Sequence, residues 1–444
     1  MSSKRNIFKN GIANLIQKFI RVAEQLFLVP FFISAWGAAY YGEWLTLTII
    51  PSVLGFSDFG FGSAAANTFV LRYASGDKQG AANIAKAGRR VITWVILVVL
   101  VLSILVMLSL QYFGVFNKSL IPANESLIAV CCMIVAKLVN FYQQLYDALY
   151  RAVRKADVSR HLLNIYGFAT IGLGILILSL GGGIVAFAVG NLILSLVFNP
   201  IYMFVSQRIT KIQEFKTAVV HSSDIRETFK IGMGFMLAPA WQSLLFQGST
   251  FVVRLVLGPT AVAIYNTVRT LSRSVNQVFT VIYSSVLPEL QYEIGANNFE
   301  KARKLFLTCM ITTVGLSFLG MIFLAFFGLK FYHIWTHNSL NPPFLMWLFF
   351  VLSIGFNALW WTAEVIFIAK NEPFRIHIAG LICSIISLIL VFISCKFWGL
   401  TGTGIAAFVF ELMMAIYIIP HSFKMIGMKW SDVNISNIKL LMNK

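Results

Sequence analysis

Charged residues are scarce in this sequence. Asp, Glu, Lys and Arg make up 12% of its 444 residues, about half of the share found in soluble domains. Two long stretches, Val91 to Gly114 and Leu162 to Gln207, contain none of them. A soluble fold cannot cover its surface with such segments, and a single core does not grow to this size. The scarcity excludes a disordered chain and a soluble nucleic-acid-binding protein, so we expect no nucleic acid partner and predict a polytopic membrane protein.

Cysteine and recognisable catalytic motifs are also scarce. The five cysteines lie within or at the ends of apolar runs and have no metal-ligand spacing, which excludes a disulfide scaffold and predicts no metal site. The sequence has no glycine-rich phosphate loop, no metal-binding His pair and no nucleophile elbow. We therefore expect a protein that is not an enzyme and has no cofactor. Without an ATP-binding motif, transport would be driven by the membrane potential or by an ion gradient, with H⁺ or Na⁺ as the candidate coupling ion.

Long apolar runs are what the sequence has instead. A membrane-spanning helix needs about 20 mostly apolar residues, and twelve segments meet this requirement. The predicted fold is therefore an all-α polytopic integral membrane protein with twelve transmembrane helices. The predicted spans are Gly11–Ser34, Gly42–Arg72, Val91–Tyr112, Asn124–Tyr150, His161–Leu180, Gly183–Ser206, Ile231–Leu257, Ala261–Leu290, Leu305–Leu329, Phe344–Ala369, Ile376–Cys395 and Thr401–Pro420.

The basic residues predict the orientation of these spans. Only Lys118, Lys330 and Lys396 lie in the predicted outer loops, whereas most of the 35 Lys and Arg residues lie in inner segments. Inner loops of membrane proteins carry an excess of Lys and Arg. Both termini are therefore expected in the cytoplasm. All outer loops are short, which argues against a membrane enzyme with a large outer domain.

The longest inner loop divides the spans into two groups of six. It covers 207–230, where apolar and basic residues alternate in a pattern typical of a short helix on the membrane surface. The predicted organisation is an N-lobe at 1–206, a linker at 207–230, a C-lobe at 231–421 and a cytoplasmic tail at 422–444. The end of the second span, Leu71–Gly76, is similar to the end of the eighth, Leu290–Gly295. Two parallel lobes, as in alternating-access carriers, explain this similarity; chance is the alternative.

Six cations lie inside the predicted spans. Each costs about 2.5–3.5 kcal/mol at a helix centre, so a wet cavity or a partner is required. At helical spacing, polar side chains share a narrow face with a cation on four spans. We expect Lys18, Arg21, Lys137, Arg269 and Arg273 to bind an anion in a shared cavity, whereas Arg254 is expected to reach the membrane surface. The predicted polar lining is Asn14, Gln25, Asn140, Gln144, Gln247, Asn266, Asn276 and Gln277.

Four acidic residues in the spans give this cavity an alternative. Glu24, Asp58, Glu364 and Glu411 could each pair with a cation and make the whole set structural. They could equally serve as gating or ion-coupling groups. The sequence leaves both roles open. Because there are more cations than acids, a surplus of positive charge is expected in either case.

Motifs near the N-terminus resemble a known family. Gly37-Ala38-Ala39-Tyr40-Tyr41-Gly42-Glu43-Trp44 is followed by Asp58-Phe59-Gly60-Phe61-Gly62-Ser63-Ala64-Ala65-Ala66-Asn67 and then by Gly76-Asp77. This sequence resembles the polysaccharide transporter family, specifically Wzx-type O-antigen repeat-unit flippases. They belong to the MOP exporter superfamily, with multidrug extruders (MATE) and lipid II flippases. Asp58, Gly60 and Asn67 match family-typical positions.

The resemblance implies two six-helix lobes in a V. It implies export of undecaprenyl-pyrophosphate-linked oligosaccharide, the O-antigen repeat unit of lipopolysaccharide biosynthesis, across the bacterial inner (cytoplasmic) membrane to the periplasmic leaflet. Membrane lipid and polysaccharide-assembly proteins are the other expected partners. The competing functions are an ion-coupled small-molecule extruder of the same fold, a membrane-embedded polysaccharide polymerase and a non-transporting scaffold.

Overall fold

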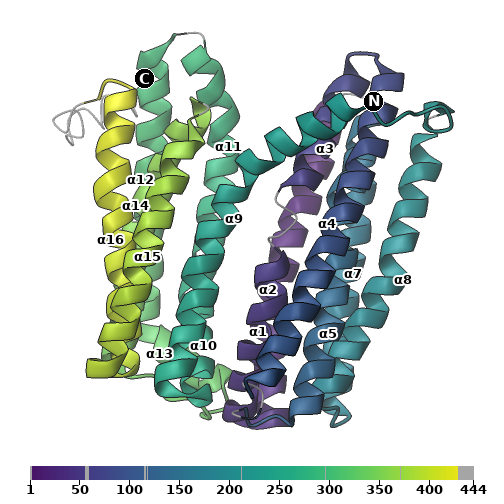
Figure 1. Cartoon of the computed structure of the whole chain (residues 1–444). Helices are drawn as coiled ribbons and strands as arrows, with labels where there is room; N and C mark the ends of the chain where they lie inside the picture. The colour runs from purple at the N-terminus through teal and green to yellow at the C-terminus, as the bar shows by residue number, and fades with distance from the viewer. Residues whose placement is uncertain are drawn as a thin grey trace. The chain divides into compact units, whose positions relative to one another are not determined.

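The computed structural model describes residues 3–55, 60–114, 117, 119–211, 213–295, 297–370 and 372–428. Every regular element in these ranges is a helix (Figure 1). The helices are α1 (Ser3–Leu47), α2 (Ile49–Gly55), α3 (Phe61–Ala74), α4 (Lys78–Tyr112), α5 (Ala123–Val139), α6 (Tyr142–Ala152), α7 (Ala156–Ser179), α8 (Ile184–Thr210), the 3-10 turn η3 (Gln213–Phe215), α9 (Ser222–Leu257), α10 (Pro259–Ser274), α11 (Asn276–Gly295), α12 (Phe299–Phe323), the π-helical turn η4 (Leu324–Gly328), α13 (Leu329–Trp335), α14 (Phe344–Ala369), α15 (Pro373–Trp398) and α16 (Leu400–Met425).

All twelve predicted spans coincide with helices. Eight helical segments are long and apolar enough to cross a membrane by length and composition. The other four predicted spans fall on α1, on α2 with α3, on α9 and on α10 with α11. Because lipid offers no hydrogen-bond partners, a spanning backbone must satisfy its polar groups internally, as a helix does. The predicted class, an all-α polytopic membrane protein, is confirmed.

Two glycines break the helices of the first two predicted spans, one between the spans and one within the second. Gly37 interrupts the helical conformation inside α1 with φ 74° and ψ 166°. Gly60, with φ 70°, stands directly before α3. Residues with a Cβ atom rarely adopt such positive φ angles, whereas glycine does so at little cost. The second predicted span is therefore divided between α2 and α3.

Two further spans are interrupted at residues that are not glycine and have negative φ angles. The fourth predicted span is divided at Asn140 into α5 and α6, and the eighth is divided at Val275 into α10 and α11. At the first interruption, the backbone N–H groups of Asn140 and Phe141 donate to Lys137 and Leu138, three residues back. Interruptions of this kind occur where polar groups line a cavity rather than face lipid.

The linker region differs from its prediction. Instead of a short surface helix across 207–230, α8 continues to Thr210, only the turn η3 follows in the described residues, and α9 begins at Ser222. Because the last residues of the linker belong to a continuous 36-residue helix, that part is a helix start and not a separate amphipathic element. Most of the predicted cytoplasmic tail, 429–444, lies outside the described residues.

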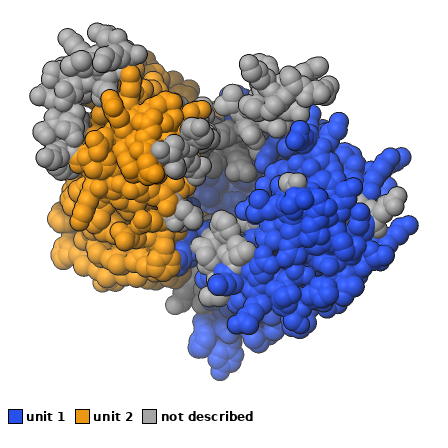
Figure 2. Space-filling model, turned by 90° about the horizontal axis from the view of Figure 1, so that it is seen from above, with its two compact units in different colours: residues 1–243 blue, residues 244–444 orange. Residues whose placement is uncertain are grey.

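The chain forms two compact units, Met1–Ser243 and Leu244–Lys444, coloured separately in Figure 2. Unit 1 contains α1 to α8 and the first part of α9. Unit 2 contains the rest of α9 and α10 to α16. In unit 2, α14 packs against α16, α12 and α11, and α15 packs against α16.

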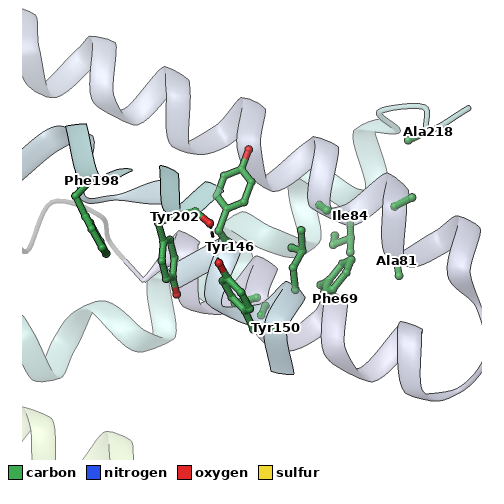
Figure 3. Packing of buried hydrophobic residues seen from close by; sticks show 13 residues of the cluster. Phe69, Ala81, Ile84, Tyr146, Tyr150, Phe198, Tyr202 and Ala218 are labelled. Atoms are coloured by element: carbon green, nitrogen blue, oxygen red, sulfur yellow. Dashed lines mark hydrogen bonds between the residues drawn. The ribbon is translucent and has the colours of Figure 1, made fainter. Parts of the chain in front are cut away.

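The core of unit 1 includes an aromatic cluster built by α3, α4, α6 and α8 (Figure 3). Phe69, Tyr150 and Tyr202 are fully buried in it. The hydroxyl of Tyr150 donates to the backbone carbonyl of Tyr202 at 2.9 Å, so the polar end of a buried ring has a partner. The cluster fixes α6 against α8, and these two helices also carry part of the polar site described below.

The outer surface of α4 is apolar. Val101, Leu105 and Leu108 are 55–58% exposed, although water-facing helices carry polar residues on their outer face. This pattern is that of a helix whose outer face contacts lipid. It agrees with the absence of charge between Val91 and Gly114.

Close packing in unit 2 gives a first testable expectation. A Cβ atom at Gly402 of α16 would lie 2.3 Å from the backbone carbonyl of Ser394 in α15. Backbone atoms cannot move aside as a flexible side chain can, and overpacking costs roughly 1–3 kcal/mol. We expect Gly402→Ala to lower the thermal unfolding temperature of the detergent-solubilised protein. Gly315→Ala is the matched control, since nothing lies within 4 Å of a Cβ atom there; equal unfolding temperatures would contradict the expectation.

Candidate functional site

Unit 1 contains a cavity of about 460 Å³, which we call the N cavity. It lies among α1, α2, α5, α6, α7 and α8. Its charged and amide-bearing lining residues are Glu24, Lys137, Asn140, Gln143, Asn164 and Asn191, and its aromatic lining residues are Trp44, Tyr166 and Phe187. Such a mixture of a cation, amides and ring faces suits a polar ligand that carries a negative charge.

Lys137 is the cation of the N cavity. It lies in the last turn of α5, where the partial negative charge of a helix C-terminus favours a cation. Its side chain is exposed, and it makes no ion pair with the residues that the structure describes. The ammonium group therefore has hydrogen-bond donors available for a ligand.

The interruption between α5 and α6 is built around Asn140. Its Oδ1 accepts hydrogen bonds from Asn199 at 2.8 Å, from Gln143 at 3.1 Å and from Ser195 at 3.2 Å. Gln143 also donates to Asn199 Oδ1 at 3.0 Å. Because Asn140 and Asn199 are fixed by several bonds, this wall of the N cavity is rigid, and it places Lys137 one turn away.

Because the fourth predicted span is divided into two helices, its polar residues do not all lie on one common face. The sequence grouped Lys137, Asn140, Gln144 and Asp147 on one helical face. In the structure, Gln143 lines the N cavity, and Gln144 is not among its lining residues. Asp147 belongs to a separate cluster, where it accepts a hydrogen bond from Ser159 and pairs with Arg151 at 3.1 Å.

A second, smaller cavity of about 30 Å³ lies in unit 2, and we call it the C cavity. It is lined by Arg269, Arg273, Asn276, Asn357 and Glu411, together with several hydroxyl-bearing and apolar residues. This volume holds about one water molecule. Asn276 Oδ1 and Asn357 Oδ1 are buried and accept no hydrogen bond among the described residues.

Arg269 is held in the C cavity by neutral groups. Its guanidinium donates to the backbone carbonyl of Phe246 at 2.9 Å and to the side-chain oxygen of Asn266. It also lies over the ring of Tyr265, 4.8 Å from the ring centre. Among the described residues no carboxylate pairs with it, so its positive charge is not neutralised.

Arg273, by contrast, is paired with an acid. Its Nη2 lies 2.7 Å from Glu411 Oε1. The other carboxylate oxygen, Oε2, accepts from Asn357 at 2.8 Å and from Trp360 at 2.6 Å. The Glu411 side chain is only 5% exposed. For Glu411 the sequence left an ion pair and a coupling role open, and the structure has the ion pair.

The other predicted site residues lie as follows. Asn266 is buried beside Arg269, and Gln247 is half-buried on α9 and lines neither cavity. Glu364 lies on α14 and makes no ion pair within the described part of the chain. Asp58 and the side chains of Asn14, Lys18, Arg21, Gln25 and Gln277 lie outside the described residues. No group of His, Cys, Asp and Glu in the described ranges could hold a metal ion.

Sequence reasoning missed several residues of the two cavities. Gln143, Asn164 and Asn191 line the N cavity, and Asn357 and Trp360 hold Glu411 in place. Gln143 carried a usable signal, because it lies three residues after Asn140 and so shares its helical face. Single polar residues such as Asn191 and Asn357 in long apolar runs gave no pattern to follow.

The described geometry agrees with what comparisons with known proteins find. Residues 4–291, well over half of the chain, match the model of the family described as "Polysaccharide biosynthesis protein". No curated protein matches the chain significantly.

Several solved structures are similar to the whole chain. An inward-facing multidrug resistance transporter of the MATE family has a TM-score of 0.74 at 15% identity, over 93% of this chain and 94% of that one. An outward-facing multidrug resistance transporter of the MATE family has a TM-score of 0.66 at 14% identity, over 96% of both chains. A MOP superfamily transporter from Pyrococcus furiosus, described as having a binding pocket of reverse polarity, has a TM-score of 0.63 at 13% identity, over 95% and 94%. At these identities the similarity shows the fold.

Proposed function

Because the chain belongs to the polysaccharide biosynthesis protein family, we propose that it is a flippase for undecaprenyl-pyrophosphate-linked oligosaccharide. The cargo would be an O-antigen repeat unit, moved from the cytoplasmic to the periplasmic leaflet of the bacterial inner membrane by alternating access. Both termini would lie in the cytoplasm. The observation that carries the proposal is the N cavity, which combines room for sugar rings with a lysine that makes no ion pair with the residues that the structure describes.

The N cavity suits the sugar part of this cargo. Sugar hydroxyls both donate and accept hydrogen bonds, as do the amides of Asn164 and Asn191 and the hydroxyl of Thr170, all of which line the cavity. The ring faces of Trp44 and Phe187 offer apolar surface for the faces of pyranose rings. Lys137 would bind an acidic group of the cargo as a compact point charge.

The arginines of the C cavity have the chemistry to bind a phosphate, which would enter once the cavity opens beyond the one water molecule that it holds in this structure. A guanidinium presents a planar fork of donors that matches phosphate oxygens. Arg269 is already oriented by Phe246 and Asn266, so less conformational freedom is lost on binding. Arg273 could reach a phosphate only by exchanging Glu411 for it. Within the C cavity we therefore assign the phosphate contact during transport to Arg269 and a conditional contact to Arg273.

The membrane potential would supply a direction for export. Moving one negative charge outward from a negative interior gains about 2.3 kcal/mol per 100 mV, and a pyrophosphate carries more than one such charge. Glu24, the acid that lines the N cavity, would be the candidate group if H⁺ or Na⁺ is also coupled to transport.

Depletion of the protein in its native host tests the proposal. We expect lipid-linked repeat units to accumulate on the inner leaflet and surface polysaccharide to fall, and wild-type protein supplied from a plasmid should restore both. Intact surface polysaccharide together with increased drug sensitivity would instead identify an ion-coupled extruder. Unchanged lipid-linked intermediates in the depleted cells would contradict the flippase proposal.

A further inference from the structure

A large apolar groove lies in unit 1, away from the N cavity. It measures about 830 Å³ and is formed by α4, the beginning of α3 and the first part of α9. One wall consists of Val91, Val95, Val98 and Val99, which follow one another on one face of α4. For comparison, an apolar cavity of roughly 150 Å³ is enough to bind benzene. The groove therefore has room for a long apolar chain.

The start of α9 is fixed in place, so that the groove is a defined feature of this unit. Arg72 at the end of α3 pairs with Asp224 at 3.0 Å and with Glu227 at 2.8 Å, and it also donates to the backbone carbonyl of Gly80. Deeper in the groove, the rings of Phe61 and Phe229 stack with centres 4.8 Å apart. These contacts tie the first turns of α4 and α9 to α3, and Figure 1 shows the beginning of α9 near α3.

One cation lies at one end of the groove. Arg90 is the only charged residue among its lining residues; its side chain is exposed and has no ion pair with any described residue. Along α4, Arg90 precedes Val99 by about 14 Å at about 1.5 Å per residue. Trp94, 69% exposed, lies one turn after Arg90, and tryptophan is enriched at the level of lipid headgroups. The groove thus has one charged end and one apolar end, which is the pattern expected of a site that runs from the lipid headgroups into the hydrocarbon.

We propose that this groove binds the polyprenyl chain of the lipid-linked cargo before transport, with Arg90 bound to its phosphate at that stage. The inference rests on the proposed function and adds a binding site for the lipid tail. A single apolar track with one cation at its end matches a lipid with one chain and a terminal phosphate, whereas a bilayer phospholipid has two chains. Because the chain would come from lipid or detergent hydrocarbon and not from water, its affinity would rest on packing in the groove and on the contact with Arg90, and neither depends on the sugar.

Binding of undecaprenyl phosphate, which has no sugar, tests the groove directly. The purified full-length protein would be titrated with this lipid in detergent and examined by native mass spectrometry. Arg90→Ala should weaken binding about tenfold, as expected for loss of a charge-assisted hydrogen bond. Arg89→Ala is the matched control, because Arg89 is an exposed neighbour that does not line the groove. Equal losses in both variants would overturn the proposal.

Filling the groove provides a second, independent variant. Val98 is 57% exposed, so Val98→Trp should fold, occupy the groove and abolish binding of undecaprenyl phosphate. Ile104→Trp is the control, since Ile104 is 51% exposed on the same helix and lies outside the groove. Val98→Ala, which widens the groove, should keep binding. Phosphatidylglycerol that competes equally with undecaprenyl phosphate would overturn the assignment to a polyprenyl chain.

Transport by the same variants separates this inference from the proposed function. In proteoliposomes that contain lipid-linked oligosaccharide, wild-type protein and Ile104→Trp should transport, and Val98→Trp should not. Full transport by Val98→Trp would overturn the groove proposal and leave the flippase proposal intact. Failure of the wild type to transport, while undecaprenyl phosphate still binds in the groove, would overturn the flippase proposal alone.

Discussion

A Lys137→Glu variant is expected to fold and insert normally and to transport about a hundredfold more slowly than the wild type. That factor corresponds to roughly 3 kcal/mol, which is within the range for removing a buried charge contact to a ligand. Reversal of the charge places a carboxylate where the proposed cargo presents an acidic group. Because Lys137 is exposed and makes no ion pair with described residues, the free energy of unfolding should change by only about 0.5 kcal/mol.

Two further substitutions make this prediction specific. Lys137→Arg should retain most transport, because it keeps the positive charge at the same place. Lys330→Glu reverses an exposed lysine that lines neither cavity, and it should leave transport unchanged. The measurement is the rate at which labelled lipid-linked oligosaccharide becomes accessible at the far leaflet of proteoliposomes. Normal transport by Lys137→Glu would remove the N cavity from the cargo pathway.

The second large effect concerns the buried pair of Arg273 and Glu411. Arg273→Gln leaves Glu411 charged in a site where its side chain is 5% exposed, and loss of one partner of a buried pair costs about 3–5 kcal/mol. We expect a marked fall in unfolding temperature and in the yield of folded protein. A second change, Glu411→Gln, should recover most of the stability, because no buried charge remains and the new amide oxygen can still accept from Asn357 and Trp360.

The double variant separates a structural role of Arg273 from a role in binding. Its folding should be close to that of the wild type, whereas its transport should remain low if Arg273 also contacts the cargo. A thermodynamic cycle over the wild type, both single variants and the double variant gives the coupling energy of the pair. Wild-type transport by the double variant would make the pair structural and leave Arg269 as the arginine of the site.

The helical fold was predictable from the sequence because lipid imposes a simple rule. A run of about 20 apolar residues has to become a helix in a membrane, and the described residues of the twelve runs are helical apart from short interruptions. Interruptions at Asn140 and Val275 were not predictable from the same pattern. Polar residues spaced three or four apart mark one face of a helix whether that helix is continuous or divided. A glycine at position 60 permits a break in the helix, but the sequence does not show that a break is present there.

The site was predictable in its residue types and less so in its contacts. The positions of Lys137, Asn140 and Arg269 in polar surroundings followed from helical spacing. The pairing of Arg273 with Glu411 joins residues 138 apart in sequence, and only the packing of α10 against α16 brings them together. Spacing along one helix carries no information about the helix opposite. For that reason Asn357 and Trp360, which complete the surroundings of Glu411, were not foreseen.

The two asparagine oxygens of the C cavity that accept no hydrogen bond from the described part of the chain favour a ligand that can donate one. Asn276 Oδ1 and Asn357 Oδ1 can only accept hydrogen bonds, while Arg269 beside them can only donate. A small inorganic anion such as chloride or sulfate satisfies the arginine and leaves both amide oxygens bare. A cargo group that carries a hydroxyl next to an acidic oxygen would satisfy both kinds of neighbour once the cavity opens beyond the one water molecule that it holds in this structure. Chloride and sulfate salts should therefore compete poorly with the cargo for this cavity. Cargo analogues that lack the adjacent hydroxyl should bind more weakly than the cargo itself.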